Sequence, residues 1–134
     1  MKLKLLKITA ILLLLAGGFY SCEKENEEYT SIIGKWKLVK IFFPMMGKTD
    51  DYSQHNVVYE FNENGILTIS VQADHIDIYS AHEMGKHTYS IIEYENYIML
   101  KIDNTMYGYD ISSTNMIIGN ASLDGEIYYF AYNQ

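Results

Sequence analysis

Alternation of apolar and polar residues with a period of two is the feature that most constrains the fold of this chain. The pattern recurs from residue 34 onward, and no segment after the N-terminal region carries apolar residues at helical spacing over three turns. Clusters of Asn, Asp, Gly and Ser, which are typical turn residues, bound the alternating runs. The sequence therefore predicts eight strands, at 34–43, 55–61, 66–72, 86–93, 97–103, 105–111, 115–120 and 126–132.

The lengths of the connections decide between the two folds that short antiparallel strands form, a barrel and a sandwich. The connections 62–65, 94–96 and 112–114 are short, whereas 44–54 and 73–85 are long. In a meander, alternate connections lie at the same end, so both long ones lie opposite the short ones. We therefore expect an all-β, eight-stranded antiparallel up-and-down barrel that is closed at one end and open at the other.

The first strand supports closure of the barrel. Its apolar phase slips by one residue at Leu38-Val39, which predicts a β-bulge and the strand bending that a closed barrel requires. Trp36 lies near the end with the short connections. We expect its side chain to fill the floor of the barrel, with the indole N–H bound to a carbonyl.

The first 21 residues have the organisation of a secretory signal peptide. Three lysines lie within residues 1–7, and residues 8–20 are apolar or small. An apolar segment of this length is too short to cross a bilayer as a helix. Segment 1–21 is thus expected to target the chain for export.

The end of this segment, Phe19-Tyr20-Ser21-Cys22, resembles a bacterial lipobox. The resemblance implies that Cys22 becomes the lipidated N-terminus, so that acyl chains such as palmitate anchor the protein to membrane lipid. It also implies the outer membrane of a Gram-negative bacterium, facing the periplasm or the cell surface. The alternative is ordinary secretion with Cys22 as a free thiol.

The charge pattern sets the domain organisation and excludes some functions. Residues 22–31 are polar and acidic, which indicates a solvated tether, and residues 32–134 form the predicted domain. The chain has 17 acidic residues, ten lysines and no arginine. Nucleic-acid binding is therefore not expected, and a single cysteine excludes an internal disulfide.

Three motifs resemble lipocalin-like domains of bacterial lipoproteins. They are Gly34-Lys35-Trp36 at the first strand, Tyr59–Gly65 with its Phe-Asn turn, and Asp124–Phe130 at the last strand. The resemblance covers about residues 32–132 and implies the lipocalin-like architecture, with Gly34, Trp36 and Gly65 in structural roles. It implies no particular ligand.

The candidate ligand-binding residues lie on or beside the long connections, at the open end of the predicted barrel. Methionine side chains adapt to apolar ligands, although simple packing on the rim explains the methionines equally well. The candidates are Met45, Met46, Tyr52, His55, His75 and His82.

A metal site is less well supported than solvated loop histidines. His82 and His87 are five residues apart, one too many for the metalloprotease pattern. No arrangement typical of a catalytic site appears in the sequence. We therefore expect no enzyme activity, no metal and no cofactor.

Three hypotheses about function follow. The first is a membrane-anchored, non-enzymatic lipoprotein whose barrel binds a small, largely apolar ligand. The alternative is a surface module that docks a partner protein or a polysaccharide, with the barrel as scaffold. A hydrolase is a third and weaker hypothesis. The sequence leaves the ligand and the oligomeric state open.

Overall fold

A computed structural model describes residues 31–71, 82–120 and 124–134. Within these ranges the chain consists of strands joined by turns, with one short 3₁₀ helix, η1. The elements are β1 (Gly34–Phe43), η1 (Pro44–Met46), β2 (Lys48–Asp51), β3 (Val57–Phe61), β4 (Ile66–Val71), β5 (Gly85–Tyr94), β6 (Tyr97–Ile102), β7 (Thr105–Ile111), β8 (Asn115–Asn120) and β9 (Ile127–Tyr132).

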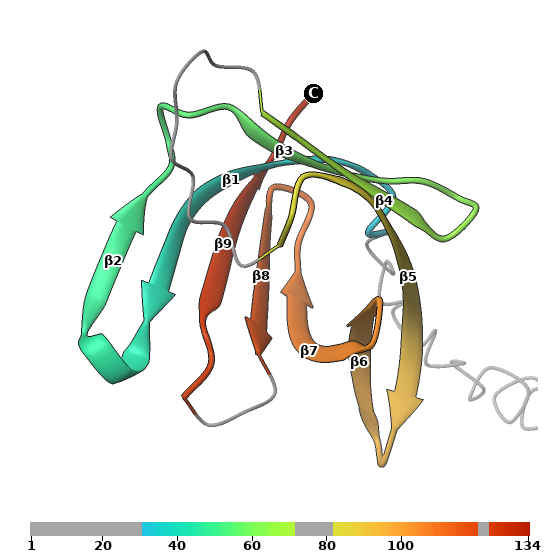
Figure 1. The fold of residues 1–134 in the computed structure, drawn as a ribbon. Coiled ribbons are helices and arrows are strands. Elements are labelled where there is room, and N and C mark those ends of the chain that lie inside the picture. Colours follow the sequence, from blue (N-terminus) through green and yellow to red (C-terminus); the bar gives the residue numbers. More distant parts are fainter. Residues whose placement is uncertain (1–30, 72–81, 121–123) are drawn as a thin grey trace, which may run out of the picture.

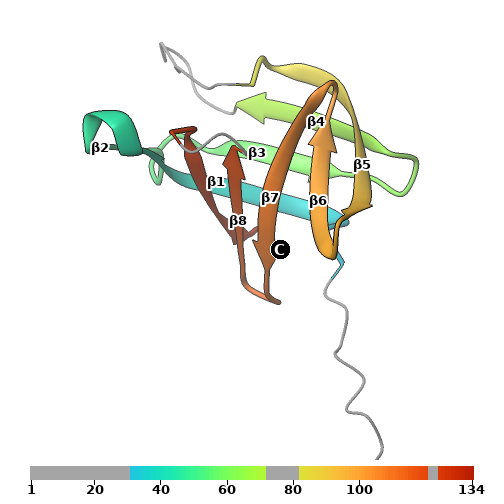
Figure 2. The same cartoon turned by 90° about the horizontal axis from the view of Figure 1, so that it is seen from below.

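The strands form one antiparallel sheet that closes on itself. The order is β2-β1-β3-β4-β5-β6-β7-β8-β9, and β1 also pairs with β9. Eight strands thus make a closed up-and-down barrel, with β2 added outside the ring (Figure 1). Figure 2 shows the strands from the underside of Figure 1. The predicted fold class is confirmed, and each of the eight predicted strands corresponds to an observed one.

The interpretation of 44–54 as a long loop is wrong in part, because this segment contains β2. The distal half of β1 pairs with β2, from Phe43 with Lys48 to Lys40 with Asp51. The sequence Lys48-Thr49-Asp50-Asp51 lacks apolar alternation, so the sequence pattern could not reveal this strand. Its pairing follows from the length of β1, which continues beyond Lys37, the last residue of β1 that pairs with β3.

The bulge in β1 and the position of Trp36 are confirmed. The β1–β9 register shifts between Leu38 and Lys40. The Trp36 side chain is 1% exposed, and its Nε1–H donates to the Ile32 carbonyl at 2.8 Å. The Tyr132 ring contacts the indole edge-on, with 5.1 Å between ring centroids.

Large side chains from every strand of the barrel except β5 fill its interior. Leu38, Ile41, Tyr59 and Phe61 are buried from β1 and β3, and Met116, Ile118, Tyr128 and Phe130 are buried from β8 and β9. Tyr89 of β5 packs against this cluster from a half-buried position. The barrel is therefore held together by a continuous apolar core.

The register shows which segments share an end. Gly34 pairs with Phe61 at the floor, and Val57 pairs with Val71 at the opposite end, which we call the mouth. Tyr52 lies near the mouth, where its N–H donates to the Val39 carbonyl. Of the predicted connection 73–85, residues 73–81 lie outside the described residues. No helix in the described ranges has the length and apolar character needed to cross a membrane.

Candidate functional site

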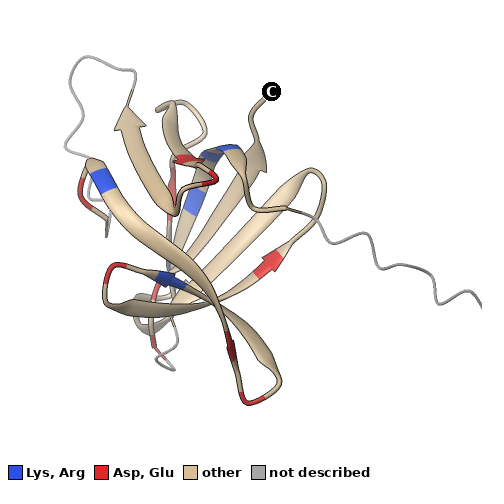
Figure 3. Cartoon of the chain, turned by 90° about the vertical axis from the view of Figure 1, so that its right-hand side faces the viewer, with Lys and Arg blue, Asp and Glu red and all other residues tan. Residues whose placement is uncertain are grey.

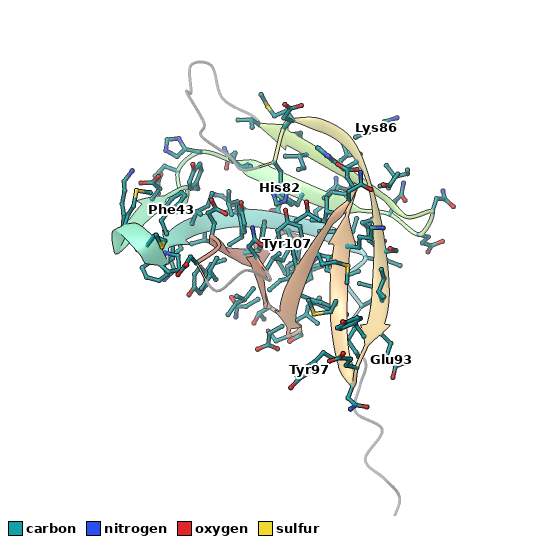
Figure 4. The ribbon with its side chains drawn as sticks, turned by 60° about the horizontal axis from the view of Figure 1, so that its bottom comes forward. Phe43, His82, Lys86, Glu93, Tyr97 and Tyr107 are labelled. Carbon is teal, nitrogen blue, oxygen red and sulfur yellow. The ribbon has the colours of Figure 1, made fainter. Side chains whose placement is uncertain are left out.

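A histidine surrounded by tyrosines lies inside the barrel at the mouth. His82 comes just before β5 and is 7% exposed. Its Nδ1 lies 2.9 Å from the Tyr59 hydroxyl, and its Nε2 lies 3.0 Å from the Tyr107 hydroxyl. The Tyr128 ring contacts the imidazole at 5.0 Å between centroids. Figure 4 shows His82 and Tyr107 together within the ribbon.

Burial keeps this histidine uncharged. Removal from water, with a smaller repulsion from His87, lowers the pKa of His82 to about 4. Burial also raises the pKa of the Tyr128 hydroxyl. A neutral imidazole has one donor and one acceptor nitrogen. One tyrosine hydroxyl therefore donates to His82 and the other accepts from it.

The expectation of solvated loop histidines is wrong for His82. The imidazole fits because two tyrosine hydroxyls satisfy it within the apolar core, so no buried polar atom there is left unpaired. Tyr52 is also buried, and the half-buried His55 contacts the Tyr52 ring at 5.9 Å between ring centroids.

Met45 and Met46 lie apart from that cluster. Both belong to η1, at the tip of the β1–β2 hairpin, and both are exposed. Tyr52 is opposite Val39, several residues back along β1. The methionines therefore do not line the mouth together with Tyr52 and His82. His75 and Cys22 lie outside the described residues.

His87 forms a second, separate pair with Asp103. Its Nδ1 lies 2.7 Å from the Asp103 carboxylate, and its Nε2 lies 2.6 Å from the Glu83 carbonyl. Burial opposes protonation, but these two acceptors outweigh it and raise the pKa of His87. The pair fixes the β6–β7 turn to the start of β5. No group of three or more metal-ligating side chains occurs in the described ranges.

The backbone conformation explains why glycine occurs at two positions that were predicted to be structural, Gly34 and Gly65. Gly34 has φ of +135°, and a Cβ there would lie 3.0 Å from the Tyr132 ring. Gly65 has φ of +76° in the β3–β4 turn. Both positions require glycine.

A pair of glycines on the outer face of the barrel has no such requirement. Gly108 of β7 pairs with Gly119 of β8 in the middle of the wall. Neither has a positive φ, and a Cβ at either position would meet nothing within 4 Å. Glycine weakens a strand interior, so neither backbone geometry nor close packing explains this pair.

The two glycines form the floor of a shallow hollow. Met99 of β6, Ile117 of β8 and Ile127 of β9 supply apolar walls, and Asp110 and Asn120 add polar groups to the lining. The hollow is open to solvent and has a volume of about 440 Å³.

The hollow lies within a longer apolar row on the outer face. Successive pairings place Ile92, Met99, Gly108, Gly119, Ile127 and Phe42 side by side across six strands. The outer face of a barrel in water is ordinarily polar. A row without a single charged residue is therefore an unusual surface.

Sequence reasoning missed this hollow. Gly108 and Gly119 lie on adjacent predicted strands on either side of the predicted turn at 112–114. Pairing the two strands symmetrically about that turn would have placed Gly108 opposite Ile118, one residue away from the observed partner Gly119. The sequence therefore brought the two glycines near each other but did not give the register that pairs them.

Comparison with known proteins adds no identification. No family model, no curated protein and no solved structure matches this chain.

Proposed function

We propose that this protein is a non-enzymatic, membrane-anchored lipoprotein that binds a small, largely apolar ligand in the hollow on the outer face of its barrel. The observation that carries the proposal is the Gly108–Gly119 pair. Two paired glycines within the strands of the wall lower stability without a conformational reason, and together they keep a surface site open. A site of this kind allows a ligand to approach the backbone closely.

The lining of the hollow defines the chemistry of the ligand. Met99, Ile117 and Ile127 offer apolar and adaptable contacts. The volume of about 440 Å³ matches a ligand of the size of a small ring system or a short acyl segment. Asp110 is exposed at the edge and favours a ligand with one hydrogen-bond donor or positive group.

The interior of the barrel supports ligand binding less well. The Tyr59 and Tyr128 rings, together with His82, occupy the space below the mouth. A ligand entering there would have to displace hydrogen-bonded, buried side chains. Binding on the outside requires no such displacement.

The anchor is part of the proposal and rests on the sequence around Cys22. Acylation of the only cysteine, placed directly after the apolar segment, would hold the barrel at the cell envelope. The lipocalin-like motifs agree with a barrel carried by such a lipoprotein. Mass spectrometry of the protein isolated from its native membrane tests this part, since an unmodified Cys22 contradicts it.

Titration with the apolar fluorophore N-phenyl-1-naphthylamine tests the hollow. Gly119→Leu fills it, and we expect affinity to fall by about tenfold or more as the apolar contact area is lost. Ser90→Leu adds the same side chain to an exposed position on β5 and should leave affinity unchanged. Equal affinity of Gly119→Leu and the wild type would contradict the proposal.

A second function, docking of a partner protein or polysaccharide, is favoured by a different observation. Met45 and Met46 are exposed on η1, at the tip of the β1–β2 hairpin. Phe43, labelled in Figure 4, directly precedes η1 and pairs with Lys48. Crosslinking in intact cells with Met45→Asp and Met46→Asp tests it. Loss of a crosslinked partner with retained fluorophore binding supports docking through this hairpin as a separate function.

A further inference from the structure

The β5–β6 hairpin extends beyond the wall of the barrel. The β4–β5 register ends with Ile66 opposite Thr88, and the β6–β7 register ends with Met99 opposite Gly108. β5 and β6 continue past both points, paired with each other up to Tyr94 and Tyr97. Figure 1 shows this hairpin reaching below its neighbours. Its tip is thus a free, two-stranded projection.

This projection carries exposed apolar side chains on both faces, and the exposed Glu93, which pairs with Ile98, is the charged residue of its strands. Ile91 and Ile98 belong to one face, and Tyr94 and Tyr97 belong to the other; all four are exposed. Tyr97 is 70% exposed and lies at the very end of the hairpin (Figure 4). A water-facing hairpin would ordinarily keep one face polar, so four exposed hydrophobic side chains divided between two faces, with a carboxylate among them, suit an interfacial environment.

The hairpin lies at the end of the barrel from which the chain leads back to Cys22. Gly34 pairs with Phe61, and the Phe61 ring contacts the Tyr89 ring at 4.9 Å. Tyr94 follows five residues after Tyr89, a strand length of about 17 Å. Cys22 and Ile33 are eleven positions apart in the chain, which corresponds to a span of at most about 38 Å. A lipid at Cys22 would therefore keep the hairpin tip within reach of the same bilayer.

The charge of the tip specifies the kind of bilayer. Glu93 and Glu95 flank Tyr94, and no lysine occurs between Lys86 and Lys101. In Figure 3 the lowest hairpin turn is acidic and the lysines lie higher on the barrel. Carboxylates are repelled by anionic lipids and tolerated beside the ammonium groups of zwitterionic ones. Tyrosine is the residue that membrane interfaces favour.

We propose that the tip of the β5–β6 hairpin, through Ile91, Tyr94, Tyr97 and Ile98, inserts into the headgroup region of the bilayer that holds the Cys22 lipid. The inference rests on the proposed anchor and adds a second membrane contact that orients the barrel. Zwitterionic lipid is the occupant of this surface. With two contacts, the barrel stands with its mouth away from the bilayer.

A tryptophan reporter at the tip tests this orientation. The lipidated full chain is reconstituted in phosphatidylcholine–phosphatidylethanolamine vesicles that contain brominated lipid, which quenches only emitters within the bilayer. Trp36, the only tryptophan of the wild type, is buried and should not be quenched. Tyr97→Trp adds an emitter at the tip, and we expect brominated lipid to reduce that added emission by about twofold or more.

Met45→Trp is the matched control. Met45 is 74% exposed, close to the value for Tyr97, and it follows β1 at the opposite end of the barrel. Its emission should not change with brominated lipid. Replacing part of the phosphatidylcholine with phosphatidylglycerol should reduce the quenching of Tyr97→Trp, and so should adding Ile98→Glu to that variant. The emission of Trp36 verifies that each variant is folded.

Mass spectrometry of the same protein samples distinguishes failure of the proposed Cys22 anchor from failure of the proposed hairpin contact. A lipidated Cys22 with equal quenching of Tyr97→Trp and Met45→Trp overturns the hairpin contact and leaves the anchor intact. An unmodified Cys22 overturns the anchor and the hairpin inference with it. Protection of the tip by a bound protein instead of lipid also overturns the inference.

Discussion

The two faces of strand β8 differ in how their residues are covered. Met116 and Ile118 point inward and are fully buried, whereas Ile117 is 37% exposed and Gly119 leaves an open space on the outer face. The inward residues pack against neighbours from the other strands. The outward residues line a hollow without being covered.

This difference shows where the barrel can bind a ligand. Its interior is filled by its own side chains, so the inner face contributes stability. The outer face, at the Gly108–Gly119 pair, gives up side-chain contacts that would stabilise the wall. Residues on the inner face should therefore control unfolding, and residues at the hollow should control binding.

The largest expected effect lies on the inner face, at Trp36. Trp36→Ala should lower the free energy of unfolding by about 3–5 kcal/mol through the cavity left in the floor. Ile117→Ala, on the outer face of the same barrel, should lower it by less than about 1 kcal/mol. Chemical denaturation of both variants measures the contrast, and equal losses would remove the distinction between the faces.

His82 should make the stability of the inner face depend on pH. Its pKa is about 4 in the folded protein against 6.5 for a free side chain, so the unfolded chain binds the proton more readily. His82 therefore contributes stability above pH 6.5, and this is lost as the pH falls toward 4, by about 3 kcal/mol.

The comparison variant is His82→Gln, which keeps a donor and an acceptor but does not titrate. Between pH 7 and pH 4.5, the melting temperature of the variant should fall less steeply than that of the wild type. His87→Gln should change the profile in the opposite sense, because the pKa of His87 is raised. If the melting temperatures of the wild type and of His82→Gln fell equally with pH, this would contradict the burial of an uncharged His82.

The smallest expected effect lies at the hollow. Gly119→Ala should raise the free energy of unfolding by about 0.4–1 kcal/mol, because a Cβ fits and the unfolded chain loses freedom. Gly34→Ala is the control of opposite sign, since its φ is positive and its Cβ would press on Tyr132. A destabilised Gly119→Ala would mean that the glycine has a structural role.

The strands, the bulge and the floor were predictable because each depends on local sequence. Alternation places the strands, the phase slip places the bulge at Leu38–Lys40, and a tryptophan near the short turns places the floor. β2 was not predictable, because its pairing depends on the part of β1 beyond the β1–β3 pairing and not on its own residues.

The candidate site was less predictable because it depends on contacts between distant segments. His82 looked like a loop residue, and its burial follows from Tyr59 and Tyr107, which reach it from β3 and β7. The hollow needs the registers of β6 to β9 at once. Alternation predicts which side chains face outward, but it does not predict which of them are neighbours on adjacent strands.

Methyl NMR during titration with N-phenyl-1-naphthylamine tests the central claim most directly, since residues of both faces report at once. Binding at the hollow predicts shifts at Met99, Ile117 and Ile127, with Leu100, Met116 and Ile118 unchanged. Shifts confined to the inward-facing methyl groups would place the ligand inside the barrel and contradict the account.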